Sequence, residues 1–359
     1  MSQSHDTSDP HHHGGGGPAG DAGGRPVLRA RGPVDLLAAV PRMLGFHPDR
    51  SVVMLTVGPA AVPFHARVDL PTDPVGIEAV AAQLSGVAVR HAVAQVVLVL
   101  YTADAGLAEA LRTELDRRLS ACGVDVLCCL RADGGRWWDV DRSDDDDRVG
   151  DDPGSPYDVS THPITAEAVL EGRVVLPSRQ AVADSLVGDD PLEAERIAEL
   201  ADSLLGRLCG KPPGHRSSGH RLDLEARWLR RRVARFLVDG ARLDTDDVAR
   251  VAALVSAVVS LRDVAWADMT RADACRHVDL WRDVVRRSPV ALRASPAALL
   301  GFAAWLSGDG ALAWCAVERA LEAQPGHGLA SLLAQALDGA VPPSTWTPVP
   351  RGRLPPYAG

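Results

Sequence analysis

The sequence predicts an α/β domain followed by an all-α domain. Up to about residue 185, apolar runs of strand length alternate with longer segments whose apolar residues recur at helical spacing. From about residue 190 onward, every candidate element has helical spacing. The 359 residues are enough for two domains, each of which can bury its own core.

The predicted domain boundaries follow these changes of pattern. The chain divides into a disordered tail at 1–30, the α/β domain at 31–187, the helical domain at 188–346 and a C-terminal tail at 347–359. The first tail is low in complexity, because the run His11–His13 is followed by four glycines.

The α/β domain opens with a predicted helix and a β-hairpin. Val34–Leu44 has apolar residues at helical spacing, and a Gly-Phe-His-Pro-Asp loop follows it. Ser51–Val57 is a run of apolar and β-branched residues, typical of a buried strand, and Phe64–Leu70 alternates apolar with polar residues. Because Gly58 and Pro59 begin a short turn between these runs, we expect them to pair antiparallel.

The rest of this domain alternates between helix and strand. The predicted helices are Pro74–Val89 and Asp104–Ala121, and the predicted strands are Ala94–Tyr101, Val124–Leu130 and Arg136–Val140. Such alternation indicates a sheet that is at least partly parallel, with helices packed against it. Gly172–Arg179 resembles a strand entering a turn, with Ser178 as a helix cap, and should close the domain.

Neither the aspartate-rich segment nor the cysteines have the spacing of a metal site. Residues 139–152 hold eight aspartates without the ligand spacing of a calcium loop, so we expect a solvated loop and no metal site. None of the six cysteines forms a C-x-x-C pair, and Cys128 and Cys129 should point to opposite faces of a strand. Buried free thiols in a reducing compartment are therefore expected.

The helical domain contains seven predicted helices. They span residues 191–209, 222–238, 246–262, 271–287, 296–307, 310–324 and 328–338. Thr270 and Asp273 resemble a capping box, Pro296 follows Ser295 as at a helix start, and Asp309 should cap the next helix.

A repeat occurs inside this domain. Leu280–Pro289 aligns with Ala316–Pro325, and small or apolar residues such as Leu300, Gly301 and Ala313 fall where a tetratricopeptide repeat needs them. The pattern resembles tetratricopeptide-like helical hairpins, in which small residues let two helices approach closely. A generic helical bundle is the alternative.

The composition indicates where the protein resides and which classes of partner it can bind. The net charge is −9 and Lys211 is the only lysine, which argues against a nucleic-acid binder. The polar N-terminus predicts no signal peptide, and the longest apolar helix candidate, Val248–Leu261, is too short to cross a bilayer. We therefore expect a cytoplasmic protein without membrane contact. Because the common nucleotide, zinc-hydrolase and serine-hydrolase motifs are missing, no cofactor is predicted.

The predicted hairpin gathers the main candidate site. If residues 58–62 form the turn, Asp69 lies opposite Ser51, and Arg67 shares their face. The loop with His47 and Asp49 enters at the same end. A histidine beside a carboxylate and a guanidinium can bind a small anionic ligand or transfer a proton. The alternative is that Arg67 and Asp69 form a local ion pair while His47 caps the loop.

Two further groups are weaker candidates. Trp137 and Trp138 could stack on a planar ligand, although adjacent tryptophans on a strand more often divide between the core and a domain interface. Arg227, Arg231 and Arg235 recur every four residues, which suits an acidic partner or phosphate, or simply a solvated helix face.

Several separate segments resemble one known family. They are Asp35-Leu-Leu with Leu-Gly-Phe-His-Pro-Asp-Arg-Ser51, Ala-Arg-Val-Asp-Leu-Pro71, Gly-Arg-Val-Val-Leu-Pro-Ser-Arg179, Ala-Trp-Cys-Ala-Val-Glu-Arg-Ala-Leu321 and Pro-Pro-Ser-Thr-Trp346. In this order they resemble domain of unknown function 4192, an actinobacterial family. The resemblance implies a bacterial cytoplasmic protein and no particular reaction. Many members of that family carry cysteines after the tryptophan pair, where this chain has its aspartate-rich loop, so the resemblance supports no metal or redox role here.

The leading functional hypothesis is a non-catalytic binding or scaffold protein. The helical domain would present a groove to a protein partner, and the α/β domain would bind a ligand near His47. The first alternative is an enzyme, such as a hydrolase, that acts on a small anionic substrate. There His47 would be the acid or base, Asp69 would orient it and Arg67 would hold the anion. A second alternative is a nucleic-acid regulator that uses the arginine stripe.

Overall fold

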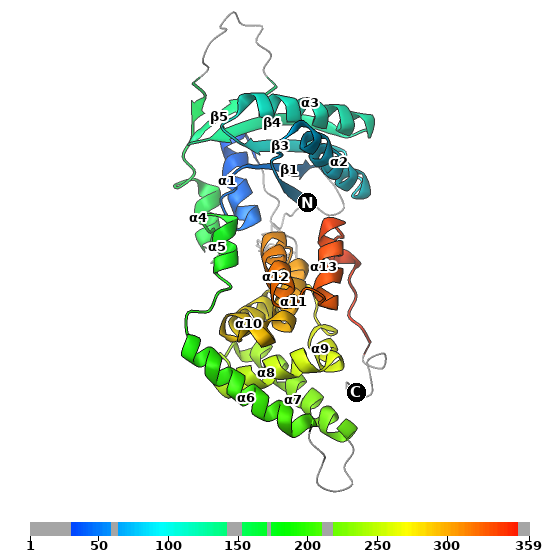
Figure 1. Ribbon diagram of the computed structural model, residues 1–359. Helices are drawn as coiled ribbons and strands as arrows, with labels where there is room; N and C mark the ends of the chain where they lie inside the picture. Colours follow the sequence, from blue (N-terminus) through cyan, green and yellow to red (C-terminus); the bar gives the residue numbers. More distant parts are fainter. Residues whose placement is uncertain (1–29, 59–63, 142–152, 171–173, 210–217, 351–359) are drawn as a thin grey trace, which may run out of the picture.

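The computed structural model describes residues 30–58, 64–141, 153–170, 174–209 and 218–350. A sheet with its covering helices forms one end of an elongated molecule, and a helical region forms the other (Figure 1). The predicted N-terminal tail, the hairpin turn and most of the aspartate-rich loop lie outside the described residues, so the predictions for them remain untested.

The sheet is mixed and has six described strands. They are β1 (Ser51–Val57), β2 (His65–Asp69), β3 (Gln95–Tyr101), β4 (Asp125–Asp133), β5 (Arg136–Asp139) and β6 (Ser155–Pro156), in the order β2-β1-β3-β4-β5-β6. Only β3 and β4 are parallel, because α3 (Ala105–Ala121) crosses over between them. The expectation of a partly parallel sheet is confirmed, whereas the short β6 was not predicted.

The opening hairpin has the predicted register. β1 pairs antiparallel with β2, with Ser51 opposite Asp69 and Val53 opposite Arg67. β1 also pairs antiparallel with β3, with Ser51 opposite Tyr101. Ser51 therefore lies in the interior of the sheet, and β2 forms its edge.

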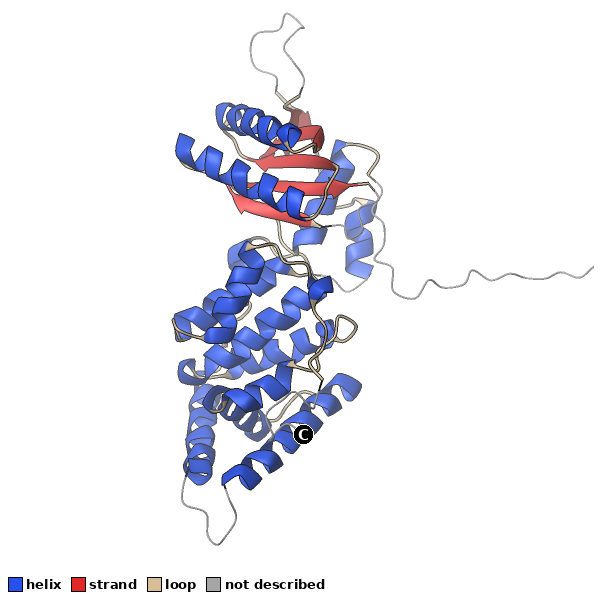
Figure 2. Ribbon diagram, turned by 90° about the vertical axis from the view of Figure 1, so that its right-hand side faces the viewer, coloured by secondary structure: helices blue, strands red, loops and turns tan. Residues whose placement is uncertain are grey.

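Helices cover both faces of the sheet (Figure 2). On one face, α2 (Pro74–Arg90) and α3 bury the apolar side chains that alternate along β2, as the sequence pattern requires. On the other face, α1 (Pro33–Leu44) packs against β1, β3 and β4. The short helix α4 (Pro163–Leu170) lies beside α1. Cys128 and Cys129 contribute to opposite faces, as expected.

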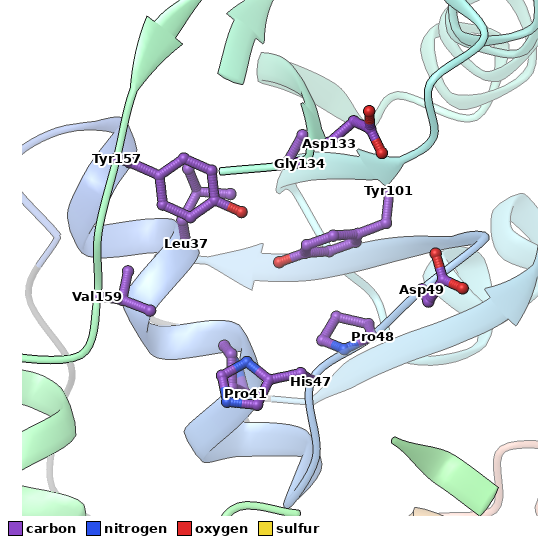
Figure 3. Close-up of a pocket in the computed structure, with 11 residues that line it drawn as sticks. Leu37, Pro41, His47, Pro48, Asp49, Tyr101, Asp133, Gly134, Tyr157 and Val159 are labelled. Carbon is purple, nitrogen blue, oxygen red and sulfur yellow. The ribbon is translucent and has the colours of Figure 1, made fainter. Parts of the chain in front are cut away.

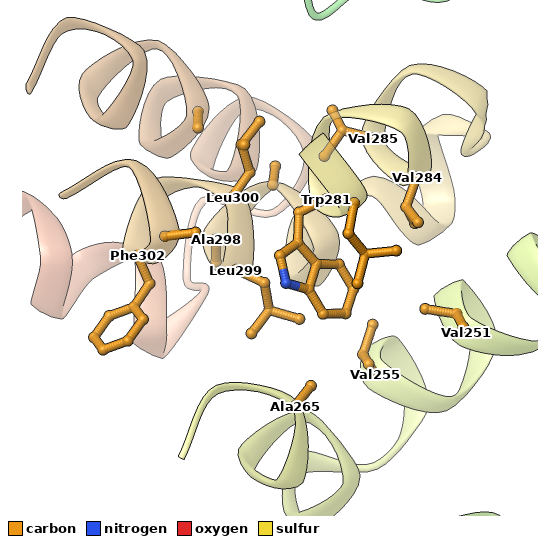
Figure 4. Packing of buried hydrophobic residues seen from close by; sticks show 14 of the residues in the cluster. Val251, Val255, Ala265, Trp281, Val284, Val285, Ala298, Leu299, Leu300 and Phe302 are labelled. Atoms are coloured by element: carbon orange, nitrogen blue, oxygen red, sulfur yellow. The ribbon is translucent and has the colours of Figure 1, made fainter. Parts of the chain in front are cut away.

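The second half of the chain is helical. Its helices are α5 (Arg179–Asp184), α6 (Pro191–Cys209), α7 (Ser218–Asp239), α8 (Thr245–Ala257), α9 (Val259–Trp266), α10 (Ala274–Arg287), α11 (Val290–Ser307), α12 (Gly310–Ala323) and α13 (Gly328–Asp338), followed by a 3-10 turn, η1 (Pro343–Thr345). The fully buried Trp281 of α10 packs between side chains of α8 and α11 (Figure 4).

Small residues permit close helix packing in this region. A Cβ atom added at Gly301 of α11 would lie 3.2 Å from Val317 Cγ2 and 3.3 Å from the Ala313 carbonyl oxygen, both on α12. A larger side chain would push α11 and α12 apart. This explains the small residues in the repeat-like stretch, while the tetratricopeptide-like arrangement itself stays a prediction.

Two predicted helix boundaries are wrong. Pro296 does not begin a helix but lies inside α11, which starts at Val290. Proline lacks the N–H that would bond the carbonyl of Leu292, and the Ser256 hydroxyl donates to that carbonyl instead, at 3.1 Å. The predicted helix at 246–262 is two helices, because Val258 has an extended backbone between α8 and α9.

The junction between the two halves differs in part from the prediction. Instead of a strand within 172–179, the described residues form one isolated bridge, between Phe46 and Leu176. Ser178 caps α5 as expected, since its hydroxyl accepts from the Ala181 N–H at 3.1 Å. Phe46 comes from the loop before β1, yet its ring is buried in the core of the helical region. A residue from the α/β half therefore packs into the core of the helical half.

One described helix, α11, is long and apolar enough to cross a membrane by length and composition. It is longer than the apolar stretch that the sequence pattern singled out. In the structure, 72% of its window is buried inside the protein, as is common for a core helix.

Candidate functional site

A small hollow adjoins the loop before β1 (Figure 3). We call it the loop pocket, and its volume is about 180 Å³. It is lined by Leu37, Pro41, His47, Pro48, Asp49, Tyr101, Ala132, Asp133, Gly134, Tyr157 and Val159. It lies entirely within the α/β half of the chain.

The sheet topology explains why polar groups gather there. Tyr101 ends β3 and Asp133 ends β4, so both lie at the carboxyl ends of the two parallel strands. In open α/β sheets, ligands bind at this edge. Because β1 runs antiparallel to β3, the loop that carries His47 and Asp49 enters at the same edge. This is the juxtaposition that the predicted hairpin implied for the loop.

Two tyrosines face each other across the loop pocket. The hydroxyls of Tyr101 and Tyr157 point toward one another (Figure 3). Tyr101 is only 9% exposed, and its hydroxyl has no hydrogen-bond partner among the described residues. Burial raises the pKa of Tyr101, and the neighbouring Tyr157 raises it further. Burial also raises the pKa of Tyr157. Both phenols therefore stay protonated and can donate as well as accept a hydrogen bond.

The remaining polar lining is rich in acceptors. Asp49 and Asp133 line the pocket, and no arginine or lysine does so among the described residues. Pro41, inside α1, has no N–H to donate to the carbonyl of Leu37, which also lines the pocket. Carboxylates and a carbonyl short of a donor favour a ligand with hydrogen-bond donors or a positive charge.

The wall formed by α1 is held by one acidic residue. Asp35 accepts from His162 Nε2 at 3.0 Å and from the Arg31 backbone N–H at 2.6 Å. The bond from the Arg31 backbone is the main reason why the pKa of Asp35 lies below its ordinary value. Since His162 follows the segment that carries Tyr157, the pair fixes two walls of the pocket to each other.

The predicted polar cluster is only partly brought together. His47 and Asp49 line the loop pocket. Ser51 is fully buried beside Tyr101, and its hydroxyl has no described partner. Arg67 instead lines a different hollow, and the two hollows share no lining residue.

Arg67 and Asp69 form the local ion pair that was one of the two interpretations. The Arg67 Nη2 atom lies 2.6 Å from an Asp69 carboxylate oxygen, and the Asp69 side chain is 79% exposed. The same nitrogen donates to the Asp49 backbone carbonyl at 3.4 Å. Within the described part of the chain, His47 makes no hydrogen bond to Asp69, so the three residues do not form one constellation.

The tryptophan pair divides between the two faces of the sheet. Trp137 packs into the cluster under α1. Trp138 points the other way, and the guanidinium of Arg131 stacks 3.5 Å from its ring centroid. The two indoles therefore do not form a joint platform for a planar ligand.

The arginine stripe lies on an exposed face of α7. Arg227 pairs with Asp223 at 2.8 Å and Arg235 with Asp239 at 3.2 Å, each across one helical turn. This geometry matches the solvated-face interpretation.

Three residues of the loop pocket were missed by sequence reasoning. Tyr101 and Asp133 could have been found, because side chains at the carboxyl ends of parallel strands meet at one edge. The predicted strand stopped at Leu130, three residues before Asp133. No sequence signal points to Tyr157, because a long loop separates it from β5.

Comparison with known proteins gives one positive result. The family model described as domain of unknown function (DUF4192) matches residues 33–344, most of the chain. Neither the curated proteins nor the solved structures provide a match. The chain belongs to the DUF4192 family, as the sequence segments indicated.

Proposed function

We propose that this member of the DUF4192 family is a non-catalytic binding protein whose α/β half takes a small ligand in the loop pocket. The observation that carries the proposal is the Tyr101 hydroxyl, which is buried at the pocket without a described partner. An unsatisfied buried hydroxyl costs about 1–3 kcal/mol. A ligand that bonds to it would recover this cost.

The pocket limits the ligand in size and charge. Its volume of about 180 Å³ is below the usual range for drug-sized ligands, roughly 300–1,000 Å³, so the ligand is small. Two carboxylates without a guanidinium favour an amine or a polyol over an anion. The two tyrosine hydroxyls can accept hydrogen bonds from an ammonium group.

We assign the helical half the role of a scaffold for a protein partner in the cytoplasm. Support comes from the close packing of α11 against α12 around Gly301, which suits tetratricopeptide-like hairpins. The exposed arginines of α7 add a charged face for an acidic partner.

We prefer binding over the enzymatic alternative because of the geometry of three residues. Hydrolysis of an anionic substrate would need His47, Arg67 and Asp69 around one concavity. His47 lines the loop pocket, whereas Arg67 lines the other hollow, so the predicted acid or base and the predicted anion-holding group do not face the same space.

A thermal-shift screen tests the proposal directly. The full chain would be melted with putrescine, choline, myo-inositol, phosphate and succinate. We expect an amine or polyol to raise Tm by about 2–4 °C, which is roughly 1 kcal/mol. Tyr101→Phe and Asp133→Asn should remove the shift. Asp189→Asn, at a carboxylate that is 91% exposed and far from the pocket in sequence, is the control and should keep it.

Two results would count against the proposal. Stabilisation by phosphate or succinate that is lost in Tyr101→Phe would show that the charge argument is wrong. A shift with an amine that survives both pocket substitutions would place its binding site elsewhere.

A further inference from the structure

We propose that a second site, between the two halves of the chain, binds an amphiphilic anion: an acidic head group on a small apolar body. The site is a groove of about 290 Å³ between β2 and α2 on one side and the segment from α11 to η1 on the other. We call it the interdomain groove. It goes beyond the proposed function, because it shares no residue with the loop pocket.

The walls of the interdomain groove are largely apolar and aromatic. Phe46 and Phe64 line it from the α/β half, and Trp305 and Trp314 line it from the helical half. Bulky rings on both sides present apolar surface to the space between them. Such walls suit an alkyl or aromatic body rather than a fully polar ligand.

Arginines outnumber carboxylates in the lining of the interdomain groove. Arg67, Arg179 and Arg271 line it, against the single carboxylate of Asp338. Arg179 is neutralised by Glu318 at 2.5 Å. Arg271 forms no hydrogen bond or ion pair with any residue that the structure describes, so its charge is available to an acidic group.

Arg67 is the second available donor. Its side chain is only 15% exposed, and its Nε–H is buried without a hydrogen-bond partner among the described residues. The ion pair with Asp69 occupies Nη2 and leaves Nε–H unused. A carboxylate or phosphate oxygen is the acceptor that such a guanidinium binds best.

The free edge of β2 adds a backbone donor. Leu70 donates its N–H to Arg50 and Thr56 donates its N–H to Phe64, which shows that even-numbered residues of this segment bond to β1. The backbone N–H of Arg67 therefore points toward the unpaired edge. Since the five consecutive residues 64–68 line the groove, this edge borders it along most of β2.

Hydrogen bonds at the end of α2 join the two walls of the groove. At the end of α2, His91 Nε2 lies 2.7 Å from the Ala340 carbonyl oxygen, and Arg90 bonds to the Gly339 carbonyl. These bonds fix the segment after α13 to the α/β half. The site is consequently preformed, which lowers the entropic cost of binding.

The size of the groove favours a small molecule over a protein segment. Its volume is close to the lower limit of ordinary ligand sites, about 300 Å³. A stable protein–protein contact buries on the order of 800 Å² on each partner, which five residues of an edge strand do not provide. An extended acidic peptide is therefore an outcome that the test must exclude.

Matched ligands of equal chain length test the proposal on the full chain. Decanoate, decyl phosphate, decanol and decyltrimethylammonium would be titrated below their micelle concentrations and followed by tryptophan fluorescence and calorimetry. We expect the two anions to bind and the cation not to bind. Comparing decanoate with decyl phosphate identifies the preferred head group.

Substitutions locate the binding site. Arg67→Gln and Arg271→Gln should each weaken decanoate binding roughly tenfold, as expected for loss of one charge-assisted hydrogen bond. Arg235→Gln, on the exposed face of α7, is the control and should leave affinity unchanged. Tyr101→Phe should also leave it unchanged, so failure here and failure of the loop-pocket proposal are distinguishable.

Three results would overturn the inference. The first is equal binding of decanoate and decyltrimethylammonium to the wild-type chain, which needs no variant to fold. The second is unchanged decanoate affinity in both arginine variants. The third is tight binding of an acetylated Glu-Val-Glu-Val-Glu peptide that decanoate does not displace, because that would assign the β2 edge to a protein partner.

Discussion

The loop pocket and the interdomain groove lie on either side of the same loop but have opposite character. Carboxylates and phenols line the loop pocket, whereas guanidiniums and indoles line the groove. The adjacent residues Phe46 and His47 enter different hollows, because successive side chains of an extended segment point to opposite sides. Position along the chain is therefore a poor guide to which groups share a site.

The two hollows also differ in which half of the chain supplies their lining residues. Every residue of the loop pocket belongs to the α/β half, so its shape depends on that half alone. The interdomain groove takes one wall from each half and depends on how they are joined. Changes at the junction or in the helical core should therefore affect the groove more than the pocket.

The largest effect is expected at Phe46, which comes from the α/β half and is buried in the helical core. Phe46→Ala should lower the free energy of unfolding by about 3–5 kcal/mol, because it leaves a cavity in the helical core. It should also abolish decanoate binding in the groove. Urea unfolding measures the first effect and calorimetry the second.

Phe46→Leu is the matched control, since it keeps an apolar side chain and should cost less than about 1.5 kcal/mol. If Phe46→Ala left both stability and decanoate binding intact, the idea that Phe46 joins the two halves would be wrong.

Acid should destabilise the helical half, and with it the groove. Burial lowers the pKa of His277 in α10 to about 4, and the neighbouring Asp273 opposes this effect only in part. The folded state therefore resists protonation that the unfolded chain accepts near pH 6.5. The stability due to neutral His277 is full above about pH 6.5 and is lost as the pH falls toward 4, by on the order of 3 kcal/mol.

Urea unfolding at about pH 7.5 and pH 5, followed by tryptophan fluorescence, checks this dependence. His277→Gln should flatten it. Burial lowers the pKa of His327 as well, so some dependence of the same sign should remain in that variant. A wild-type chain that is equally stable at both pH values would contradict the prediction.

Tyr101→Phe should stabilise the unliganded protein and abolish ligand binding in the loop pocket. Removing a buried hydroxyl without a described partner should raise the free energy of unfolding of the unliganded chain by about 1 kcal/mol. The same change should abolish the ligand-induced thermal shift. Urea unfolding without ligand is the measurement, and Tyr157→Phe is the comparison.

A loss of more than about 1 kcal/mol in Tyr101→Phe would show that the hydroxyl is satisfied in the folded protein. The argument that the pocket is prepared for a ligand would then lose its basis.

The smallest stability effect is expected at Asp35, which connects two walls of the loop pocket. Asp35→Asn should cost less than about 1 kcal/mol, since its side chain is 25% exposed and such pairs contribute little. It should nevertheless weaken the amine or polyol ligand by about fivefold, because the wall that carries Tyr157 is held less firmly. Calorimetry gives the affinity, and an unchanged value would show that the pair does not position the pocket.

Much of the α/β fold could be predicted because its signals are local. The alternation along residues 64–70 and the short turn before it were enough to set the strand register from Ser51 to Asp69. The helix caps at Asp104 and Asp309 could also be predicted, since a cap depends on residues three positions apart.

The errors arose where distant residues decide the outcome. Pro296 fits inside α11 because the Ser256 hydroxyl bonds the carbonyl that proline leaves without a donor, and nothing near Pro296 in the sequence shows this. The predicted grouping of Arg67 with His47 fails for a similar reason. Arg67 was grouped with His47 by face and end, but the interdomain groove exists only where the helical half meets β2.

The most direct test of the account is ligand-observed NMR with a fragment mixture that contains equal numbers of ammonium and carboxylate compounds. We predict that Asp49→Asn/Asp133→Asn removes ammonium fragments while carboxylate fragments still bind, and that Arg67→Gln/Arg271→Gln does the reverse. Loss of the same fragments from both double variants would contradict the claim that the protein has two binding hollows of opposite charge.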